Sequence, residues 1–198
     1  MTSIVFGEQK LMDNKLRSFI SVNISNETLL ERIMDIQNAL DYTAAKIKKI
    51  KPENIHFTLR FLGNTSESKL ALIKKELEKA SFNPFRIIIE GVGVFPKVNK
   101  PRIIWVGVTH NAPQFVELKE QIDNGLKNLG YDKDRKFIPH ATIARVRYIK
   151  KKELLKQNIT HLSERMIGEM EIYQFSMMIS TLTPDGPIYK KLWSISSS

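Results

Sequence analysis

Apolar residues recur along this chain with two different periods, which predicts a mixture of strands and helices. Short segments rich in β-branched and aromatic residues indicate strands. Longer segments with apolar residues three or four positions apart indicate amphipathic helices. Strands are expected at 16–24, 55–62, 85–95, 102–109, 139–146, 169–182 and 189–195, and helices at 25–40, 66–80, 112–129 and 151–157.

The order of these elements repeats, because each half of the chain contains a strand, a helix and a further strand. Each half also contributes one strand with polar residues at its centre. This pattern predicts an α+β fold with two similar lobes, each an antiparallel sheet with helices, and an active-site cleft between them. We expect residues 1–15 to form an N-terminal extension and residues 16–198 to form a single bilobal domain.

Composition limits the class of protein. The chain has 198 residues, of which 42% are hydrophobic and 26% charged, so it can bury a core and is not disordered as a whole. The absence of cysteine excludes a disulfide scaffold, a thiolate metal site and a cysteine nucleophile. No apolar segment approaches the ~18 residues of a membrane span, and residues 1–12 do not form a secretory signal. We therefore expect a cytoplasmic monomer with no membrane partner.

The charge balance adds a partner class. Lys and Arg together number 31 against 21 for Asp and Glu, a formal net charge of +10. Such an excess favours polyanionic partners such as RNA. The alternative is that the lysines only keep the surface soluble.

The histidines carry the clearest chemical signal. They are His56, His110, His140 and His161. His56 and His140 are each followed two residues later by threonine, Thr58 and Thr142, although only ten residues of the chain are threonine. Both pairs lie on expected strands, where residues two apart project to the same face. Each lobe would then present one imidazole and one hydroxyl to the same cleft.

This arrangement suits acid–base chemistry on a phosphate. Two imidazoles can serve as general base and general acid near neutral pH, and threonine hydroxyls can donate to phosphoryl oxygens. A single His-x-Thr is more often a half-buried polar pair on a strand, but two copies on matched strands favour a catalytic role. The histidines lack the spacing of a zinc site, and neither G-x-S-x-G nor a P-loop is present. We therefore expect neither a metal ion nor a cofactor.

Longer strings around these histidines resemble a known family. Two His-x-Thr motifs about 80 residues apart are typical of the two-histidine (2H) phosphoesterase superfamily. Within it, the chain is most similar to the RNA 2′,3′-cyclic phosphodiesterases, also called 2′-5′ RNA ligases or LigT-like proteins. The matching strings are PENIHFTLRFLG (52–63), GVGVFP (91–96), RIIWVG (102–107), PHATIARV (139–146) and GPIY (186–189).

The resemblance implies metal-independent hydrolysis of RNA 2′,3′-cyclic phosphate ends to 2′-phosphates, and reversible ATP-independent 2′-5′ ligation. It implies His140 as proton acceptor and His56 as proton donor, with RNA, including tRNA fragments, as partner. One departure is Asn23, which stands where the family usually has an acidic residue. The alternatives are an RNA-end-binding module without catalysis and a 2H enzyme for a small cyclic nucleotide.

Four further residues are candidates for substrate binding. Arg60 shares the cleft face with Thr58 if the strand is unbroken, whereas Arg145 has the opposite parity and needs a bulge to reach the cleft. Phe137 could stack on a base or pack in the core, and Tyr189 is expected to border the cleft. His110 and His161 lack the threonine and are assigned structural roles.

Overall fold

The computed structural model describes residues 14–134 and 137–198; most of the expected N-terminal extension, residues 1–13, lies outside the described residues. The helices are α1 (Glu27–Asn38), α2 (Glu67–Leu77), α3 (Ala112–Lys127) and α4 (Lys152–His161). The strands are β1 (Lys15–Asn23), β2 (Ala45–Lys49), β3 (His56–Ser66), β4 (Phe85–Phe95), β5 (Ile103–His110), β6 (His140–Ile149), β7 (Met166–Ile172), β8 (Gln174–Thr183) and β9 (Gly186–Ser196).

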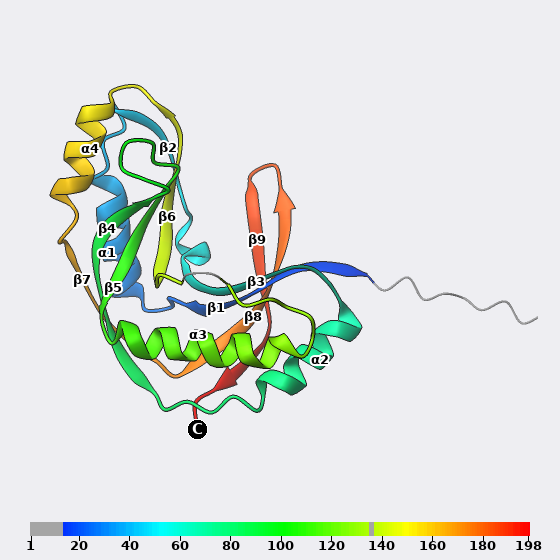
Figure 1. Ribbon diagram of the computed structural model, residues 1–198. Coiled ribbons are helices and arrows are strands. Elements are labelled where there is room, and N and C mark those ends of the chain that lie inside the picture. Colours follow the sequence, from blue (N-terminus) through cyan, green and yellow to red (C-terminus); the bar gives the residue numbers. More distant parts are fainter. Residues whose placement is uncertain (1–13, 135–136) are drawn as a thin grey trace, which may run out of the picture.

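The strands pair antiparallel in the order β7-β4-β5-β6-β3-β1-β8-β9, and β2 adds to β6. The sheet is divided into two lobes, because β3 and β6 are paired only at Phe57 and Ala141. Figure 1 shows β2, β4, β5, β6 and β7 with α1 and α4 in the upper lobe, and β1, β3, β8 and β9 with α2 and α3 in the lower lobe. The expected two-lobed α+β fold is confirmed.

Local sequence explains where the helices begin and which face they bury. The Asn26 side chain accepts a hydrogen bond from the Leu29 amide at 3.0 Å and so caps α1. Ser66 does the same for α2 through the Lys69 amide at 3.3 Å. The apolar stripe of α1, which includes Leu29 and Ile33, is fully buried against the sheet. Among the described residues no helix combines the length and apolar character needed to cross a membrane.

One expectation about strands is wrong, and one strand is additional to those expected. The expected strand 169–182 is two strands, β7 and β8, which separate at Tyr173 and pair with different neighbours, β4 and β1. The short strand β2 was not expected, because three of its five residues are lysine. Pairing with β6 holds β2 in place despite its polar sequence.

Candidate active site

The two His-x-Thr motifs meet where the lobes join. Phe57 of β3 is paired with Ala141 of β6, so the neighbouring histidines and threonines of both strands project to the opposite face from these two residues. The Phe57 ring points away from that face and contacts Phe115 of α3, with ring centroids 5.4 Å apart. The structure therefore places His56, Thr58, His140 and Thr142 together on the face turned away from α3.

The two histidine rings are held in the same way. His56 Nδ1 lies 2.8 Å from the carbonyl oxygen of Asn54, and His140 Nδ1 lies 2.7 Å from that of Ile138. Because a carbonyl oxygen only accepts, Nδ1 must carry the proton and donate in both rings. Each Nε2 is thereby left to accept or donate a proton elsewhere.

Burial favours the neutral form of both rings. It lowers the pKa of His56 from 6.5 to about 4, an effect opposed by the hydrogen bond to Asn54 and assisted by the nearby charge of His140. Burial also lowers the pKa of His140, against the hydrogen bond to Ile138. Both Nε2 atoms therefore hold a free lone pair at neutral pH before a substrate binds.

Aromatic rings supply much of this burial. Phe19 and Tyr189 lie against His56, with ring centroids at 4.9 and 5.3 Å. Phe95 packs edge-on against His140 at 4.9 Å and Trp105 lies at 6.0 Å. A glycine makes room for this indole, because a Cβ at position 93 would stand only 2.2 Å from the Trp105 ring.

Two β-bulges determine what else reaches this face. On β3, Ile20 is opposite Arg60 and Ser21 is opposite Thr58, so one residue of β3 is extra. On β6, Ile104 is opposite Ala144 and Trp105 is opposite Thr142, so again one residue is extra. From each histidine onward, nine successive positions follow the same sequence of buried and exposed classes in both strands. Beyond each bulge the parity of the strand is reversed.

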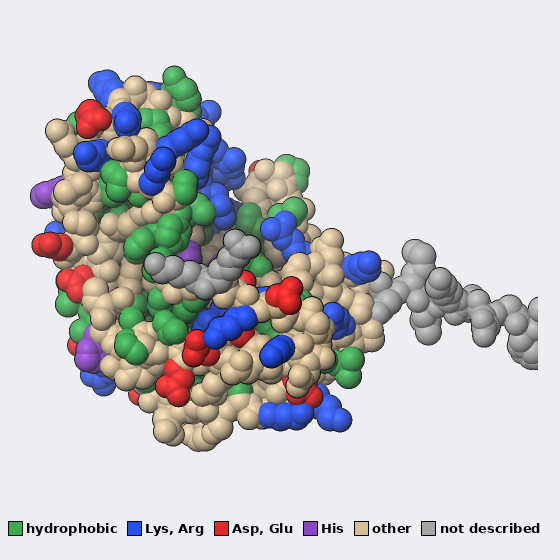
Figure 2. Space-filling view, in the orientation of Figure 1, with side chains coloured by type: hydrophobic (Ala, Val, Ile, Leu, Met, Phe, Trp, Pro, Cys, Tyr) green, Lys and Arg blue, Asp and Glu red, His purple; other side chains and the backbone are tan. Residues whose placement is uncertain are grey.

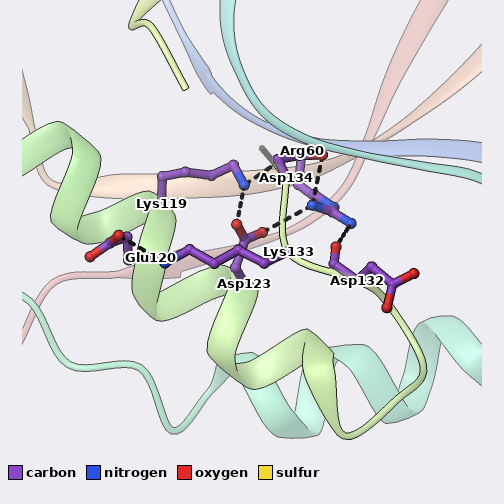
Figure 3. A network of polar contacts seen from close by, with 7 residues as sticks. All are labelled: Arg60, Lys119, Glu120, Asp123, Asp132, Lys133 and Asp134. Atoms are coloured by element: carbon purple, nitrogen blue, oxygen red, sulfur yellow. Dashed lines mark hydrogen bonds and ion pairs between the residues drawn. The ribbon is translucent and has the colours of Figure 1, made fainter. Parts of the chain in front are cut away.

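The expectation that Arg60 shares the face of Thr58 is wrong, because the bulge turns this side chain toward α3. Arg60 is 7% exposed and pairs with Asp123 of α3 at 3.3 Å and with Asp134 at 2.8 Å. It also donates to the Asp132 carbonyl. Buried Lys119 completes the network, 2.5 Å from Asp123 and 3.1 Å from Asp134 (Figure 3). The network joins β3 to α3 and to the loop that leads into β6.

Arg145, unlike Arg60, projects toward the active-site face, because the bulge in β6 turns it to that side. Burial raises the pKa of Tyr189 above 10.0, and the positive charges of Arg145 and Arg17 oppose this increase. Arg145 and Tyr189 therefore lie within electrostatic reach of each other. Tyr189 borders the site as expected, since its ring contacts His56.

Phe137 packs against the core, whereas Phe61 is the aromatic residue that lies exposed on the active-site face. The Phe137 ring contacts Phe115 at 6.0 Å, which matches the packing alternative. Phe61 was not expected on the active-site face, but the bulge in β3 leaves it 68% exposed and 6.1 Å from Phe19. A hollow of about 290 Å³ lies here, lined by Arg17, Ser18, Phe19, Phe61, Gly63, Asn64, Ser180 and Tyr189.

Positive charge surrounds this face. Figure 2 shows Lys and Arg side chains gathered where the upper lobe faces the β8–β9 hairpin. A second hollow of about 190 Å³ lies between β2 and the tip of this hairpin and includes Lys48, Lys49 and Lys51. In residues 14–134 and 137–198, no group of three carboxylate or imidazole side chains could hold a metal ion.

A two-lobed α+β fold with a His-x-Thr motif from each lobe at the junction defines the class of 2H phosphoesterases. Comparison with known families agrees, because the model of the LigT-like phosphoesterases matches residues 24–105 and again residues 106–189. The chain belongs to this family. The two successive matches correspond to the two halves that the sequence pattern indicates.

Individual relatives cover nearly the whole chain. The RNA 2′,3′-cyclic phosphodiesterase of Archaeoglobus fulgidus is 37% identical over 177 residues, 89% of this chain and 98% of that protein. That of Methanocaldococcus jannaschii is 37% identical over 176 residues, 88% and 97% respectively. The crystal structure of TT0787 of Thermus thermophilus has a TM-score of 0.77 at 25% identity over 91% of this chain and 97% of that chain. Apo LigT of E. coli has a TM-score of 0.75 at 17% identity over 93% of this chain and 99% of that chain, which shows a similarity of fold alone.

Proposed function

We propose that this chain hydrolyses RNA 2′,3′-cyclic phosphate ends to 2′-phosphates by acid–base catalysis with His56 and His140, without a metal ion. The observation that carries the proposal is that both rings are oriented by the same hydrogen bond. In each, Nδ1 donates to the backbone carbonyl two residues earlier, that of Asn54 or Ile138. Both Nε2 atoms remain for proton transfer. The Archaeoglobus and Methanocaldococcus relatives are named RNA 2′,3′-cyclic phosphodiesterases, which supports this choice of substrate.

Hydrolysis then proceeds by in-line displacement, with one proton transfer at the attacking water and one at the leaving oxygen O3′. His140 Nε2 removes a proton from water, and the water oxygen forms a bond to phosphorus. The bond from phosphorus to O3′ breaks, and His56 Nε2–H gives its proton to O3′. The products are a 2′-phosphate and a 3′-hydroxyl, and the histidines exchange their protons with solvent. The assignment of acid and base follows the family resemblance, since both rings are held alike.

Binding of the substrate favours the protonated form of His56, which is the form that can act as the acid. His56 is neutral in the free protein, because its pKa is about 4. A bound phosphate anion near the ring favours the imidazolium and raises this pKa. Thr58 and Thr142 donate to the non-bridging oxygens, whose negative charge increases as phosphorus becomes pentacovalent. Arg145 adds a fixed positive charge on the same face.

The same groups allow ligation. When the 5′-hydroxyl of a second RNA replaces water, His140 removes its proton and the bond to O3′ breaks as before. The product is a 2′-5′ phosphodiester, and ATP is not required because the cyclic phosphate supplies the leaving group. The reverse reaction regenerates the cyclic end. We take residues 16–198 to act as one domain and one monomer on such ends, including those of tRNA fragments.

The test is incubation of the protein with a short RNA that ends in a 2′,3′-cyclic phosphate, in EDTA and without ATP. Phosphorus NMR identifies the product. A 2′-phosphate formed at a rate that EDTA does not change supports the proposal. A 3′-phosphate product, or abolition by EDTA with restoration by one divalent ion, contradicts it. Tight binding of the RNA end without turnover would favour an end-binding module.

A further inference from the structure

β6 extends the active-site face beyond the catalytic motif. β2 pairs with this part of β6, with Lys48 directly opposite Arg145 and Lys46 directly opposite Tyr148. Directly opposite residues project from the same side of a sheet, and Lys46 and Lys48 are two positions apart on β2, so they share that side. A second bulge in β6, with Arg147 as the extra residue, brings Tyr148 to the same side as Arg145. Lys48 Nζ donates to the Asp185 carbonyl at the tip of the β8–β9 hairpin, at 3.2 Å. This contact across the second hollow indicates the side from which all four side chains project.

Tyr148 is an unusual residue on this side. It is 64% exposed, and its ring and hydroxyl make no ring contact or hydrogen bond within the described ranges 14–134 and 137–198. Tyr42, by comparison, donates its hydroxyl to the Gln37 carbonyl at 2.7 Å and has Lys49 Nζ 5.4 Å from its ring centroid. Tyr148 thus presents an aromatic face to a ligand without needing to move.

The cations beside Tyr148 lie in two segments that contain no acidic residue. Residues 44–51 contain four lysines, residues 139–152 contain two arginines and three lysines, and neither segment contains Asp or Glu. In the described part of the chain, the ion pairs use other cations: Arg60, Lys74, Lys79, Arg86, Lys119 and Lys133. Like charges directly opposite on a sheet, as at Lys48 and Arg145, are destabilising. A bound polyanion would relieve this repulsion.

We propose that Tyr148, Lys46, Lys48 and Arg145 form a second nucleotide subsite, which binds RNA on the 5′ side of the cyclic end. Tyr148 stacks on one base, and Lys46 and Lys48 hold the backbone phosphates that connect this base to the catalytic histidines. Arg145, beside the reacting phosphate, links the subsite to the catalytic centre. The inference rests on the proposed function, because the reacting phosphate stands at the 3′ end and the remaining strand must leave the site in the 5′ direction. Stacking on an aromatic ring tolerates any base, which suits an enzyme for RNA ends.

Binding tests this subsite independently of turnover. The probe is a fluorescein-labelled tetranucleotide RNA with a 2′-phosphate end, measured by fluorescence anisotropy. Tyr148→Ser should raise the Kd about tenfold or more, since a base–aromatic stack is lost, whereas Tyr148→Phe should bind like the wild type. Replacing each upstream nucleotide in turn by an abasic one should remove the effect of Tyr148→Ser at a single position. The matched control is Tyr173→Ser, which alters another exposed tyrosine whose carbonyl binds Ser197 near the C-terminus.

The lysines give a second readout. Lys46→Gln and Lys48→Gln should each reduce the slope of log Kd against log salt by about 0.7, as expected for one lost phosphate contact with a single strand. Lys75→Gln, at an exposed position of α2, should leave the slope unchanged. Unchanged RNA affinity in Tyr148→Ser, or an equal loss in Tyr173→Ser, would overturn the subsite.

A mononucleotide separates this inference from the proposed function. A nucleoside 2′,3′-cyclic phosphate has no upstream base, so Tyr148→Ser should hydrolyse it at the wild-type rate. An equal loss on the mononucleotide and the tetranucleotide would mean that Tyr148 acts at the catalytic centre, and the subsite would be wrong. If the wild type hydrolyses neither substrate but binds RNA through Tyr148, the proposed function falls and the subsite stands.

Discussion

Phe61 and Arg145 occupy equivalent positions in the two halves of the molecule. Each lies five residues after its histidine, and each is turned toward the active-site face by a β-bulge. One position holds an exposed aromatic ring and the other a cation. A nearly symmetric frame therefore presents an apolar surface on the side of His56 and a positive charge on the side of His140. A nucleotide needs both, since a base stacks and a phosphate pairs.

Replacing either of the two histidines that we propose as acid and base should abolish most activity. His56→Ala and His140→Ala each remove a proton-transfer group, which typically lowers the rate by about 10² to 10⁴. The measurement is initial-rate hydrolysis of a cyclic-phosphate RNA, with thermal unfolding to confirm that each variant is folded. His161→Ala is the control, because this histidine is exposed at the end of α4. A variant at position 56 or 140 that keeps a third of the activity would contradict the mechanism.

The pH dependence should differ between free and substrate-bound protein. In the free protein both pKa values lie below 6.5, and that of His56 is about 4. The pH profile of kcat/KM, which reports the free protein, should therefore be centred below pH 6.5. The phosphate anion raises both values in the complex, so the kcat profile should lie at higher pH. Coincident profiles centred above pH 7 would contradict these shifts.

Acid stability must be followed alongside these rates. The folded protein resists protonation of His56, whereas the unfolded chain takes up the proton near pH 6.5. The unfolded state therefore binds more protons between about pH 6.5 and 4, and the free energy of unfolding falls as the pH decreases through this window. His56→Ala should lose less stability than the wild type on acidification. Rates should be compared only at pH values at which circular dichroism shows that the protein is folded.

The sequence predicts the centre of the site well because the centre depends on periodicity. His56, Thr58, His140 and Thr142 are spaced by two within strands, and strand geometry brings each pair to one face. Their meeting across the lobes follows from the single paired position at Phe57, a tertiary contact with no local signal. The repeated motif, the repeated order of elements and the family resemblance indicated that the two strands would be neighbours.

The flanking residues were harder to predict because a bulge is not visible in the alternation. Arg60 and Arg145 exchange their expected faces, since one extra residue in each strand reverses the parity. A signal was nevertheless present in the sequence. On β3 the inward residues are Phe57 and Leu59 and then Arg60 and Leu62. On β6 they are Ala141 and Ile143 and then Ala144 and Val146. Both strands therefore change from odd to even inward positions three residues after the histidine.

Arg60 should act on stability. Arg60→Met leaves Asp123 and Asp134 with Lys119 as their remaining partner in a buried network. Breaking such a network by removing one partner typically costs about 3–5 kcal/mol in the free energy of unfolding. Urea denaturation measures this cost, and kcat per folded molecule should change much less. Unchanged stability with a raised KM would instead indicate that Arg60 contacts the substrate.

Arg145 should show the reverse pattern. Arg145→Gln removes an exposed cation, so stability should stay within about 0.5 kcal/mol of the wild type. Loss of a charge beside the phosphate should reduce kcat/KM for the cyclic-phosphate substrate by about tenfold or more, since hydrogen bonds to charged groups are worth roughly 1.5–3 kcal/mol. Steady-state kinetics at fixed ionic strength measure this, with Lys75→Gln as the surface-charge control. Equal kinetics in the two variants would exclude a substrate contact by Arg145.

Thr58 and Thr142 provide the sharpest test of how the phosphate is stabilised. Each hydroxyl lies on the face of its histidine, two residues along the strand, where it can donate to a non-bridging oxygen. The negative charge on these oxygens grows as water attacks, so the hydrogen bonds strengthen in the transition state. Thr→Val keeps the shape and the β-branching that suit a strand and removes only the donor.

Thr58→Val and Thr142→Val should each lower kcat by about 10² to 10³ with little change in KM, because the lost interaction belongs mainly to the transition state. Steady-state kinetics on a nucleoside 2′,3′-cyclic phosphate give both constants without contributions from upstream nucleotides. Thr→Ser at each position should restore most of the rate, since the hydroxyl returns. If the folded valine variants keep a normal kcat, the threonines only complete the strands, and Arg145 becomes the principal group that neutralises the phosphate.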